Sequence, residues 1–332
     1  MQFSTPVSIP HTKREITYQN KILLIGSCFA DNLTRHLQAS FFQATSNPFG
    51  VLYNPMSIAR CLQLLQQTHD TSAKEVAAKL PIIQQDGLFH CMTHHGCYSS
   101  ANKDILTEKT EKSLQDGAEQ LAQADTLILT FGTAWVYEQD GQIVGNCHKL
   151  PASLFHRRCL TTEETVTTYQ QIAQLPLLKQ KQVIFTVSPI RHLNDGLHGN
   201  QLSKSILLLA ADQLTGNLTT QKNDTGETIG KNDWSYFPSY EIMLDELRDY
   251  RYYADDMMHP SSKAVEYIWE RFSETYFSPQ TREEMKSLQR LYSSLHHIPL
   301  HPDTDAYKKF SEQLSEQLRH WQEKYPWIQG NK

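Results

Sequence analysis

Residues 21–33 read KILLIGSCFADNL: an apolar run, then Gly26-Ser27-Cys28, then a helix-like pattern. The run is compact and apolar and ends at a glycine, which predicts a buried strand over residues 21–25. After the tripeptide, apolar residues recur at every fourth position over residues 29–37 and would form one stripe along a helix. This stretch therefore predicts a strand that passes through a glycine directly into a helix.

Two further runs have the same character, at residues 126–131 (TLILTF) and 182–187 (QVIFTV). Uniformly apolar strands are covered on both faces, as in a parallel sheet. Thr161 and Glu164 form a capping box that opens a helix. Other helical patterns occupy residues 57–67, 105–124, 201–214 and 261–272. This alternation implies right-handed βαβ crossovers, so we expect an α/β fold: a three-layer α/β/α sandwich with a mostly parallel sheet.

The character of the chain changes after about residue 276. Residues 281–296 and 303–325 are charged and amphipathic, and we expect a helical appendage packed on the core, with a partner-binding arm as the alternative. The chain thus divides into an α/β domain at residues 1–277 and a C-terminal helical extension at residues 278–332. The polar stretch 215–233 predicts a mobile surface loop.

The composition disfavours several classes of protein. The net charge is −5 and the 31 Lys and Arg residues are scattered, so no basic patch for nucleic acid is present. No window approaches the roughly 20 consecutive apolar residues of a membrane span, and the amino terminus lacks the apolar run of an export signal. We therefore expect a cytoplasmic protein with free thiols and with no membrane or nucleic-acid partner.

In open α/β sheets, ligands bind at the carboxyl ends of the strands, so the residues that follow each strand are informative. Gly26 permits a sharp exit from the first strand, and the helix amino terminus after it lowers a thiol pKa and can hold an oxyanion. Taken alone, however, the tripeptide favours a simpler interpretation, with Ser27 as a helix cap and Cys28 as a small buried filler.

A second segment favours the catalytic interpretation of this tripeptide. In DDMMHPS, Asp256 precedes His259 by three residues, and Pro260 suits the first turn of the next helix, which fixes His259 at the edge of the crevice. A nucleophile needs a base, and the base needs a carboxylate that sets its tautomer and orientation. Together with a nucleophile after the first strand, the Asp-x-x-His pattern predicts a nucleophile–His–Asp site.

These segments resemble the first and last blocks of the SGNH (GDSL-type) hydrolases, strand-Gly-Asp-Ser-Leu and Asp-x-x-His. Gly26-Ser27-Cys28-Phe29-Ala30 is letter for letter the motif that names the GSCFA family, an SGNH-like group. The resemblance covers about residues 21–277 and implies an SGNH-type α/β fold and ester chemistry. It also includes NPFGVLYNP (47–55), FGTAWVY (131–137), GNCHKLP (145–151) and SPIRH (188–192).

The resemblance implies a role for each matching residue. Cys28 falls on the nucleophilic Ser, and Asp256 and His259 match the orienting acid and the base. Ser27 falls where the SGNH enzymes carry Asp. A shift of the register by one residue would make Ser27 the nucleophile, and the unbroken apolar run before Gly26 favours Cys28. Gly50 matches the glycine whose amide, beside that of Cys28, helps to form the oxyanion hole.

One oxyanion donor of these enzymes is missing. Gly132-Thr133-Ala134-Trp135 lies where they carry Gly-x-Asn-Asp, so an alanine replaces the Asn. Either Asn47, Asn146 or another side chain takes its place, or turnover differs from that of an ordinary esterase. After the third strand, Arg191 and His192 are candidates to bind an anionic substrate group, and a surface ion pair is the alternative.

Two other clusters offer rival sites. Residues 90–97 (HCMTHHGC) contain five possible metal ligands, but no second pair with zinc spacing lies nearby, so we expect a hydrogen-bonded loop and no metal. Cys147 and His148 follow a hairpin predicted through Asp140-Gly141. As neighbours on a strand they would point to opposite faces and would not serve each other.

We therefore expect an SGNH-like ester hydrolase that acts on an acyl group, most simply acetyl, of a small-molecule or carbohydrate ester. Cys28 or Ser27 attacks the carbonyl, His259 transfers the proton and Asp256 orients His259. No metal or redox cofactor is required. Because a Cys nucleophile forms a thioester, an acyltransferase with an acyl-CoA-like donor is one alternative. A non-catalytic carbohydrate-binding protein with the same fold is the other.

Overall fold

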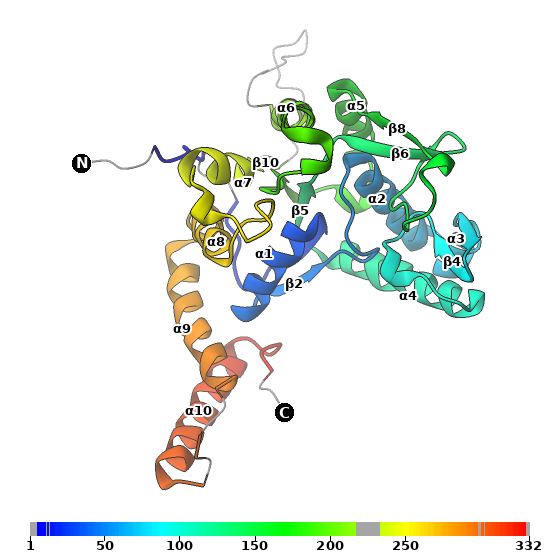
Figure 1. The fold of residues 1–332 in the computed structure, drawn as a ribbon. Coiled ribbons are helices and arrows are strands. Elements are labelled where there is room, and N and C mark those ends of the chain that lie inside the picture. Colours follow the sequence, from blue (N-terminus) through cyan, green and yellow to red (C-terminus); the bar gives the residue numbers. More distant parts are fainter. Residues whose placement is uncertain are drawn as a thin grey trace, which may run out of the picture.

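A five-stranded parallel sheet forms the centre of the computed structural model, which describes residues 5–10, 12, 14–216, 233–297, 300–301 and 303–329. The strand order is β10-β9-β5-β1-β2 (Figure 1). The strands are β1 (Lys21–Gly26), β2 (Gln43–Ser46), β5 (Thr126–Phe131), β9 (Gln182–Val187) and β10 (Trp234–Phe237). The three predicted strands are confirmed at the centre of this sheet.

Alternate residues of each central strand face two different helical layers. On β1, Leu23 and Ile25 pack into one apolar core, whereas Ile22 and Leu24 pack into the other. The first core is covered by α2 (Pro55–Asp70), α4 (Lys103–Gln123), α5 (Thr162–Ile172) and α6 (Gly196–Thr215). The second is covered by α1 (Cys28–Ala39), α8 (Ser262–Tyr276) and α9 (Pro279–Leu295). The predicted α/β/α sandwich is thus confirmed, with both faces of the sheet buried.

The helices also agree with the sequence patterns, and the capping box of Thr161 and Glu164 is present at the start of α5. The edge strands β2 and β10 were not predicted. Their sequences, QATS and WSYF, are only four residues long and partly polar, so they lack the apolar signal of the central strands. Most of the stretch predicted as a mobile loop, residues 217–232, lies outside the described residues.

Smaller elements lie between β2 and α5. They are α3 (Ala73–Ala77), the hairpin β3 (Ile82–Gln85) and β4 (Leu88–Cys91), and an antiparallel sheet of β6 (Trp135–Gln139), β7 (Gln142–Ile143) and β8 (His156–Cys159). The predicted hairpin turn is confirmed, because Asp140 and Gly141 have φ values of 49° and 74° and join β6 to β7. Cys147 and His148, by contrast, lie in a turn and not on a strand, so the predicted alternation of their faces was wrong.

Short helical turns complete the described fold. They are η1 (Gly96–Tyr98), η2 (Ala152–Leu154), η3 (Pro176–Leu178), η4 (Leu193–Asp195), α7 (Ser239–Glu241), the π-helical η5 (Ile242–Glu246) and η6 (Tyr250–Tyr252). In the part of the chain that the structure describes, no helix combines the length and apolar character needed to cross a bilayer.

The C-terminal extension contains α9 and α10 (Asp305–Lys324), which project away from the sheet in Figure 1. The segment after α10 turns back to the body of the protein. The ring of Tyr325 packs against that of Tyr18 in a tilted arrangement, with ring centroids 4.9 Å apart, and Ile328 is buried in the second core. The Trp327 indole N–H donates to the Phe41 carbonyl at 3.1 Å. The extension is therefore anchored at both of its ends.

Candidate functional site

The turn between β1 and α1 is fixed tightly against the neighbouring strand. Gly26 has a φ of +149°, and a Cβ there would lie 2.2 Å from the carbonyl oxygen of Thr130, so a glycine is required. The Ser27 amide donates to the same Thr130 oxygen at 3.2 Å. On the other side, the Gly26 amide donates to Asn47 Oδ1 at 2.8 Å. These contacts fix where α1 begins.

Ser27 and Cys28 have different positions in this turn. Ser27 is 1% exposed, and its Oγ accepts a hydrogen bond from the Phe29 amide at 3.3 Å, so it is the N-cap of α1. Cys28 is half-buried at the first position of α1, next to the amides that begin the helix. Cys28 is therefore the accessible member of the pair, whereas Ser27 is used for the local structure.

Opposing effects set the pKa of the Cys28 thiol. Burial raises the pKa of its thiol, and the nearby carboxylate of Asp31 raises it further. The two amides at the helix start and the Lys204 cation lower the pKa but do not offset that rise. The thiol is thus protonated at neutral pH, and it needs a base before it can attack a carbonyl carbon.

Asp256 and His259 form a hydrogen-bonded pair in the loop before α8. Asp256 Oδ2 lies 2.6 Å from His259 Nδ1. Asp256 Oδ1 also accepts from the amides of His259 at 3.0 Å and Met258 at 2.9 Å. These two amides and the imidazole lower the Asp256 pKa to about 2, so the side chain is a carboxylate. The neutral imidazole then carries its proton on Nδ1, which leaves Nε2 as an acceptor.

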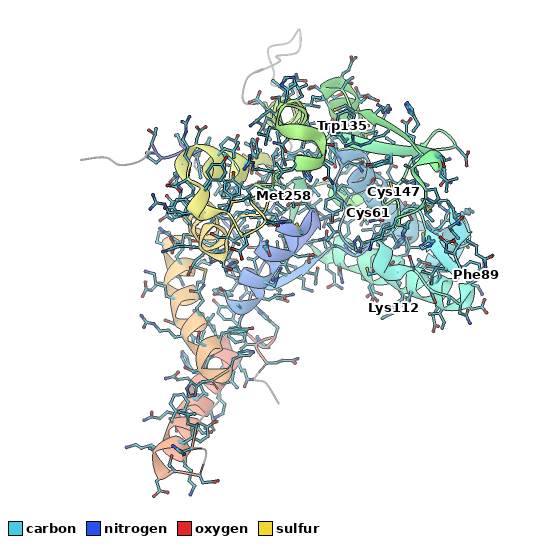
Figure 2. The ribbon with its side chains drawn as sticks, viewed as in Figure 1. Cys61, Phe89, Lys112, Trp135, Cys147 and Met258 are labelled. Atoms are coloured by element: carbon cyan, nitrogen blue, oxygen red, sulfur yellow. The ribbon has the colours of Figure 1, made fainter. Side chains whose placement is uncertain are left out.

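The loop that carries this pair is attached to the end of β9. The Arg191 amide donates to the Met258 carbonyl at 3.1 Å, and its guanidinium donates to the Met257 carbonyl at 3.3 Å. Figure 2 labels Met258 on this loop. Within the described ranges no hydrogen bond joins the Cys28 sulfur to His259. Proton transfer between them therefore needs a bridging water or substrate group, or a movement of the loop.

Arg191 lies between this loop and a cavity. Its guanidinium is 5.3 Å from the ring centroid of Tyr253 and 5.8 Å from that of Tyr250. These residues, with Asn200 and Met243, line a mainly apolar cavity of about 260 Å³. A larger cavity of about 440 Å³ lies at the opposite edge of the sheet, where Lys21 and Gln43 begin β1 and β2, and so it is remote from the candidate site.

His192 is half-buried and lies against the end of β5. Its Nε2 lies 3.1 Å from the Gly132 carbonyl oxygen. Burial and the Lys204 charge lower the His192 pKa to about 4, so the imidazole is neutral at pH 7 and donates this bond. The amides of Gly132 and Thr133 both donate to the Tyr53 carbonyl, at 2.8 and 2.9 Å. These two amides are therefore not free to bind an oxyanion.

Asn47 and Gly50 are also used within the local structure. Asn47 Nδ2 donates to Asp31 Oδ1 at 2.7 Å, in addition to the bond that Oδ1 accepts from Gly26. The Gly50 amide donates to the Asn47 carbonyl at 2.7 Å, and a Cβ on Gly50 would lie 2.4 Å from the His95 Cβ. The oxyanion role predicted for Gly50 would thus require this turn to open.

Lys204 was not among the residues predicted from the sequence. This residue of α6 is 0% exposed, and its Nζ donates to the carbonyl oxygens of Gly132 (2.6 Å) and Ser188 (2.9 Å), which directly follow β5 and β9. The sequence feature that could have indicated it is its position in the buried stripe of α6. The buried residues of α6 are Asn200, Ser203, Lys204, Leu207, Ala210 and Ala211. A lysine in an otherwise buried stripe indicates a specific partner.

The His- and Cys-rich segment 90–97 has partners of its own. His94 is fully buried, with Nε2 2.8 Å from Ser113 Oγ and Nδ1 2.9 Å from Thr93 Oγ1, and it stacks on Phe49. His90 Nδ1 lies 2.7 Å from Ser99 Oγ. In the portions of the chain described by the structure, no group of three His, Cys, Asp or Glu side chains is placed to hold a metal ion.

Two family models match this chain. The model of the GSCFA family matches residues 21–272, and the model described as GSCFA domain protein, C-terminal domain, matches residues 288–332. No curated protein and no solved structure matches the chain. The first match covers well over half of the sequence and runs from β1 into α8, so it includes Cys28, Asp256 and His259. The chain therefore belongs to the GSCFA family.

Proposed function

We propose that this protein is an SGNH-like hydrolase of acyl esters with Cys28 as its nucleophile. The observation that carries the proposal is the 2.6 Å pairing of Asp256 with His259 at the edge of the sheet where Cys28 begins α1. A half-buried thiol on helix amides, together with a base oriented by a carboxylate, is the combination that acyl transfer to sulfur requires. An acetyl ester of a small molecule or a carbohydrate is the proposed substrate.

The reaction would proceed in two steps. His259 Nε2 takes the thiol proton, directly or through a water, while the Cys28 sulfur attacks the ester carbonyl. The C–S bond forms, the C–O bond breaks, and the imidazolium gives its proton to the departing alkoxide. In the second step His259 takes a proton from water, the hydroxide cleaves the thioester, and the proton returns to sulfur. The products are a carboxylic acid and an alcohol.

The amide of Cys28 is the first proposed oxyanion donor. It lies in the first turn of α1, where the helix dipole adds to its effect. A tetrahedral intermediate bonded to the Cys28 sulfur would place its oxygen near this amide, and the Phe29 amide would join it on giving up its bond to Ser27 Oγ. This arrangement explains how a hole could form without the Asn that Ala134 replaces.

Acyl transfer is the second candidate function, because the accessible nucleophile is a thiol and not a hydroxyl. Its intermediate is a thioester, which amines and alcohols attack readily. The same residues would act, with an acceptor hydroxyl in place of water. A hydrolase and a transferase therefore differ in what enters the site after the first step.

The decisive experiment is acylation with p-nitrophenyl acetate. We expect p-nitrophenol release by the wild type and an acetyl group on the peptide that contains Cys28, detected by mass spectrometry after an acid quench. The variants Cys28→Ala and His259→Ala should lose both signals, and Ser27→Ala should keep them. Added alcohols that accelerate p-nitrophenol release would favour the transferase. A wild type that is never acetylated at Cys28 would overturn both functions and favour a non-catalytic protein.

A further inference from the structure

A buried lysine joins the two central strand ends next to the candidate nucleophile. Lys204 reaches from α6 to the carbonyl oxygens of Gly132 and Ser188, and no part of its side chain is exposed. Its Nζ also lies 5.3 Å from the ring centroid of Tyr240. Burying an ammonium group is costly unless it is hydrogen-bonded or paired with a charge. Two carbonyl oxygens and a ring satisfy the group only in part, because none of them carries a full negative charge.

The position of Lys204 relates it to Cys28 through Gly132. A Cβ on Gly132 would lie 3.5 Å from the Ser27 Cβ, so the residue that Lys204 binds is packed directly on the β1–α1 turn. Electrostatic coupling between Lys204 and Cys28 acts in both directions: the lysine charge lowers the thiol pKa, and a thiolate raises the pKa of the lysine. A thiolate at Cys28 would supply the negative charge that Lys204 lacks.

Other titratable groups face the two residues from every neighbouring element. They are Asp31 on α1, Tyr53 before α2, His192 after β9 and Tyr240 on α7. His259 is related to them indirectly, because it interacts electrostatically with His192. Burial raises the pKa of Tyr53 and raises that of Tyr240 to about 12, and it lowers that of His192 to about 4, so these three are neutral at pH 7. Asp31 is the opposing charge, which leaves Lys204 as the cation that favours a thiolate.

We propose that Lys204 is a positioning residue of the candidate site: it clamps the ends of β5 and β9, and its ammonium stabilises negative charge on the Cys28 sulfur. The inference rests on the proposed function in that it takes Cys28 as the reacting group. In this proposal Lys204 does not contact the substrate. This role explains why a lysine is placed in the buried stripe of α6, at a point where an apolar residue would remove a donor from the Ser188 carbonyl oxygen and one of the two donors, Lys204 and His192, from that of Gly132.

The test is the pH dependence of Cys28 alkylation by iodoacetamide, measured on the Cys28 peptide by mass spectrometry. Cys97, which is exposed, serves as the internal reference in the same samples. Lys204→Met should slow Cys28 alkylation at pH about 7 by about tenfold, the effect of one pKa unit, and leave Cys97 unchanged. The difference in Cys28 alkylation rate between the wild type and Lys204→Met should shrink at high pH, where Lys204 has lost its proton. Lys204→Arg, which keeps the charge, should restore part of the rate.

A purely structural lysine would give a different result: Lys204→Met would lower the unfolding temperature, and the alkylation profile of Cys28 would not move. If Lys204→Met does not fold, the reciprocal measurement in Cys28→Asp decides, because a carboxylate there is charged while Lys204 titrates, whereas the thiol is neutral. The pKa of Lys204, followed by NMR of its side-chain carbon next to nitrogen, should rise in Cys28→Asp relative to the wild type. An unchanged Lys204 pKa would overturn the proposal. Neither readout uses an ester, so a failure here is distinct from a failure of hydrolysis.

Discussion

Asp256 Oδ2 and His259 Nδ1 lie 2.6 Å apart in a loop where the same carboxylate also accepts two backbone amides. The carboxylate therefore does two things: it fixes the path of the loop, and it holds the imidazole with Nε2 free. Because its pKa is lowered to about 2, its contribution to the folded loop is present above about pH 4, where an unfolded Asp is ionised, and is lost as the pH falls through 2. Between pH 5 and 8 Asp256 stays charged.

Replacing Asp256 by Asn should reduce kcat/KM for p-nitrophenyl acetate by at least about tenfold, because an amide does not stabilise the imidazolium and can favour the wrong tautomer. Steady-state kinetics of the purified variant would measure this. Asp255→Asn is the matched control, since Asp255 is the exposed neighbour in the same loop, and it should retain wild-type kinetics. Equal losses in both variants would show that the loop responds to charge in general and not to the His259 pair.

Gly26 provides a test of the turn that presents Cys28. Gly26→Ala should destabilise the protein by several kcal/mol, on the order of 3, because the new Cβ meets the Thr130 carbonyl in a backbone conformation that L-residues avoid. Urea unfolding is the measurement. Gly141→Ala is the control, because Gly141 also has a positive φ, of +74°, but its Cβ would meet nothing within 4 Å. It should cost only about 1 kcal/mol. Similar losses for the two would contradict the close approach of β5.

The sequence predicted the parts of this site that depend on chain-local patterns. A glycine after an apolar strand, a helix cap and an Asp-x-x-His loop all leave a signal within a few residues, and Gly26, Ser27 and the Asp256–His259 pair have the predicted local geometry. The three central strands were equally visible, because each is apolar on both faces. The catalytic roles of these residues stay a prediction.

What the sequence did not reveal depends on contacts between distant segments. The Tyr53 carbonyl accepts the amides of Gly132 and Thr133 across the sheet edge, and no pattern around any of the three indicates it. Lys204 is separated by 72 residues from Gly132, whose oxygen it binds. The Gly50 amide was predicted to be free because the resemblance supplies motifs and not hydrogen-bond partners; its bond to Asn47 is evident only in the folded turn.

Ser27 should prove to be a structural residue. Ser27→Ala removes the side-chain acceptor of the Phe29 amide, so we expect a loss of about 1 kcal/mol in the unfolding free energy and unchanged alkylation of Cys28 by iodoacetamide. Ser261→Ala is a matched variant, because Ser261 caps α8 by accepting from the Ala264 amide, three residues on, at the same distance of 3.3 Å. Both should lose similar stability. If Ser27→Ala instead abolished acetylation by p-nitrophenyl acetate while Cys28→Ala kept it, the nucleophile would be Ser27.

The stability of the protein should depend on pH through Lys204. Burial lowers the folded pKa of Lys204 to about 7 from 10.5. Between these values the unfolded chain binds a proton that the folded chain has lost, so the unfolding free energy rises with pH, by up to about 1.4 kcal/mol per unit, and this slope vanishes below pH 7. Buried Cys61, with a raised pKa, acts in the opposite direction near pH 9 and above, so the useful window is about pH 7 to 8.5.

Urea unfolding across that window should give a steeper rise of the unfolding free energy with pH for the wild type than for Lys204→Met. The variant will be less stable overall, since the carbonyl oxygens of Gly132 and Ser188 lose the Lys204 donor. The comparison therefore concerns the slopes, and parallel slopes would show that Lys204 keeps its proton in the folded protein.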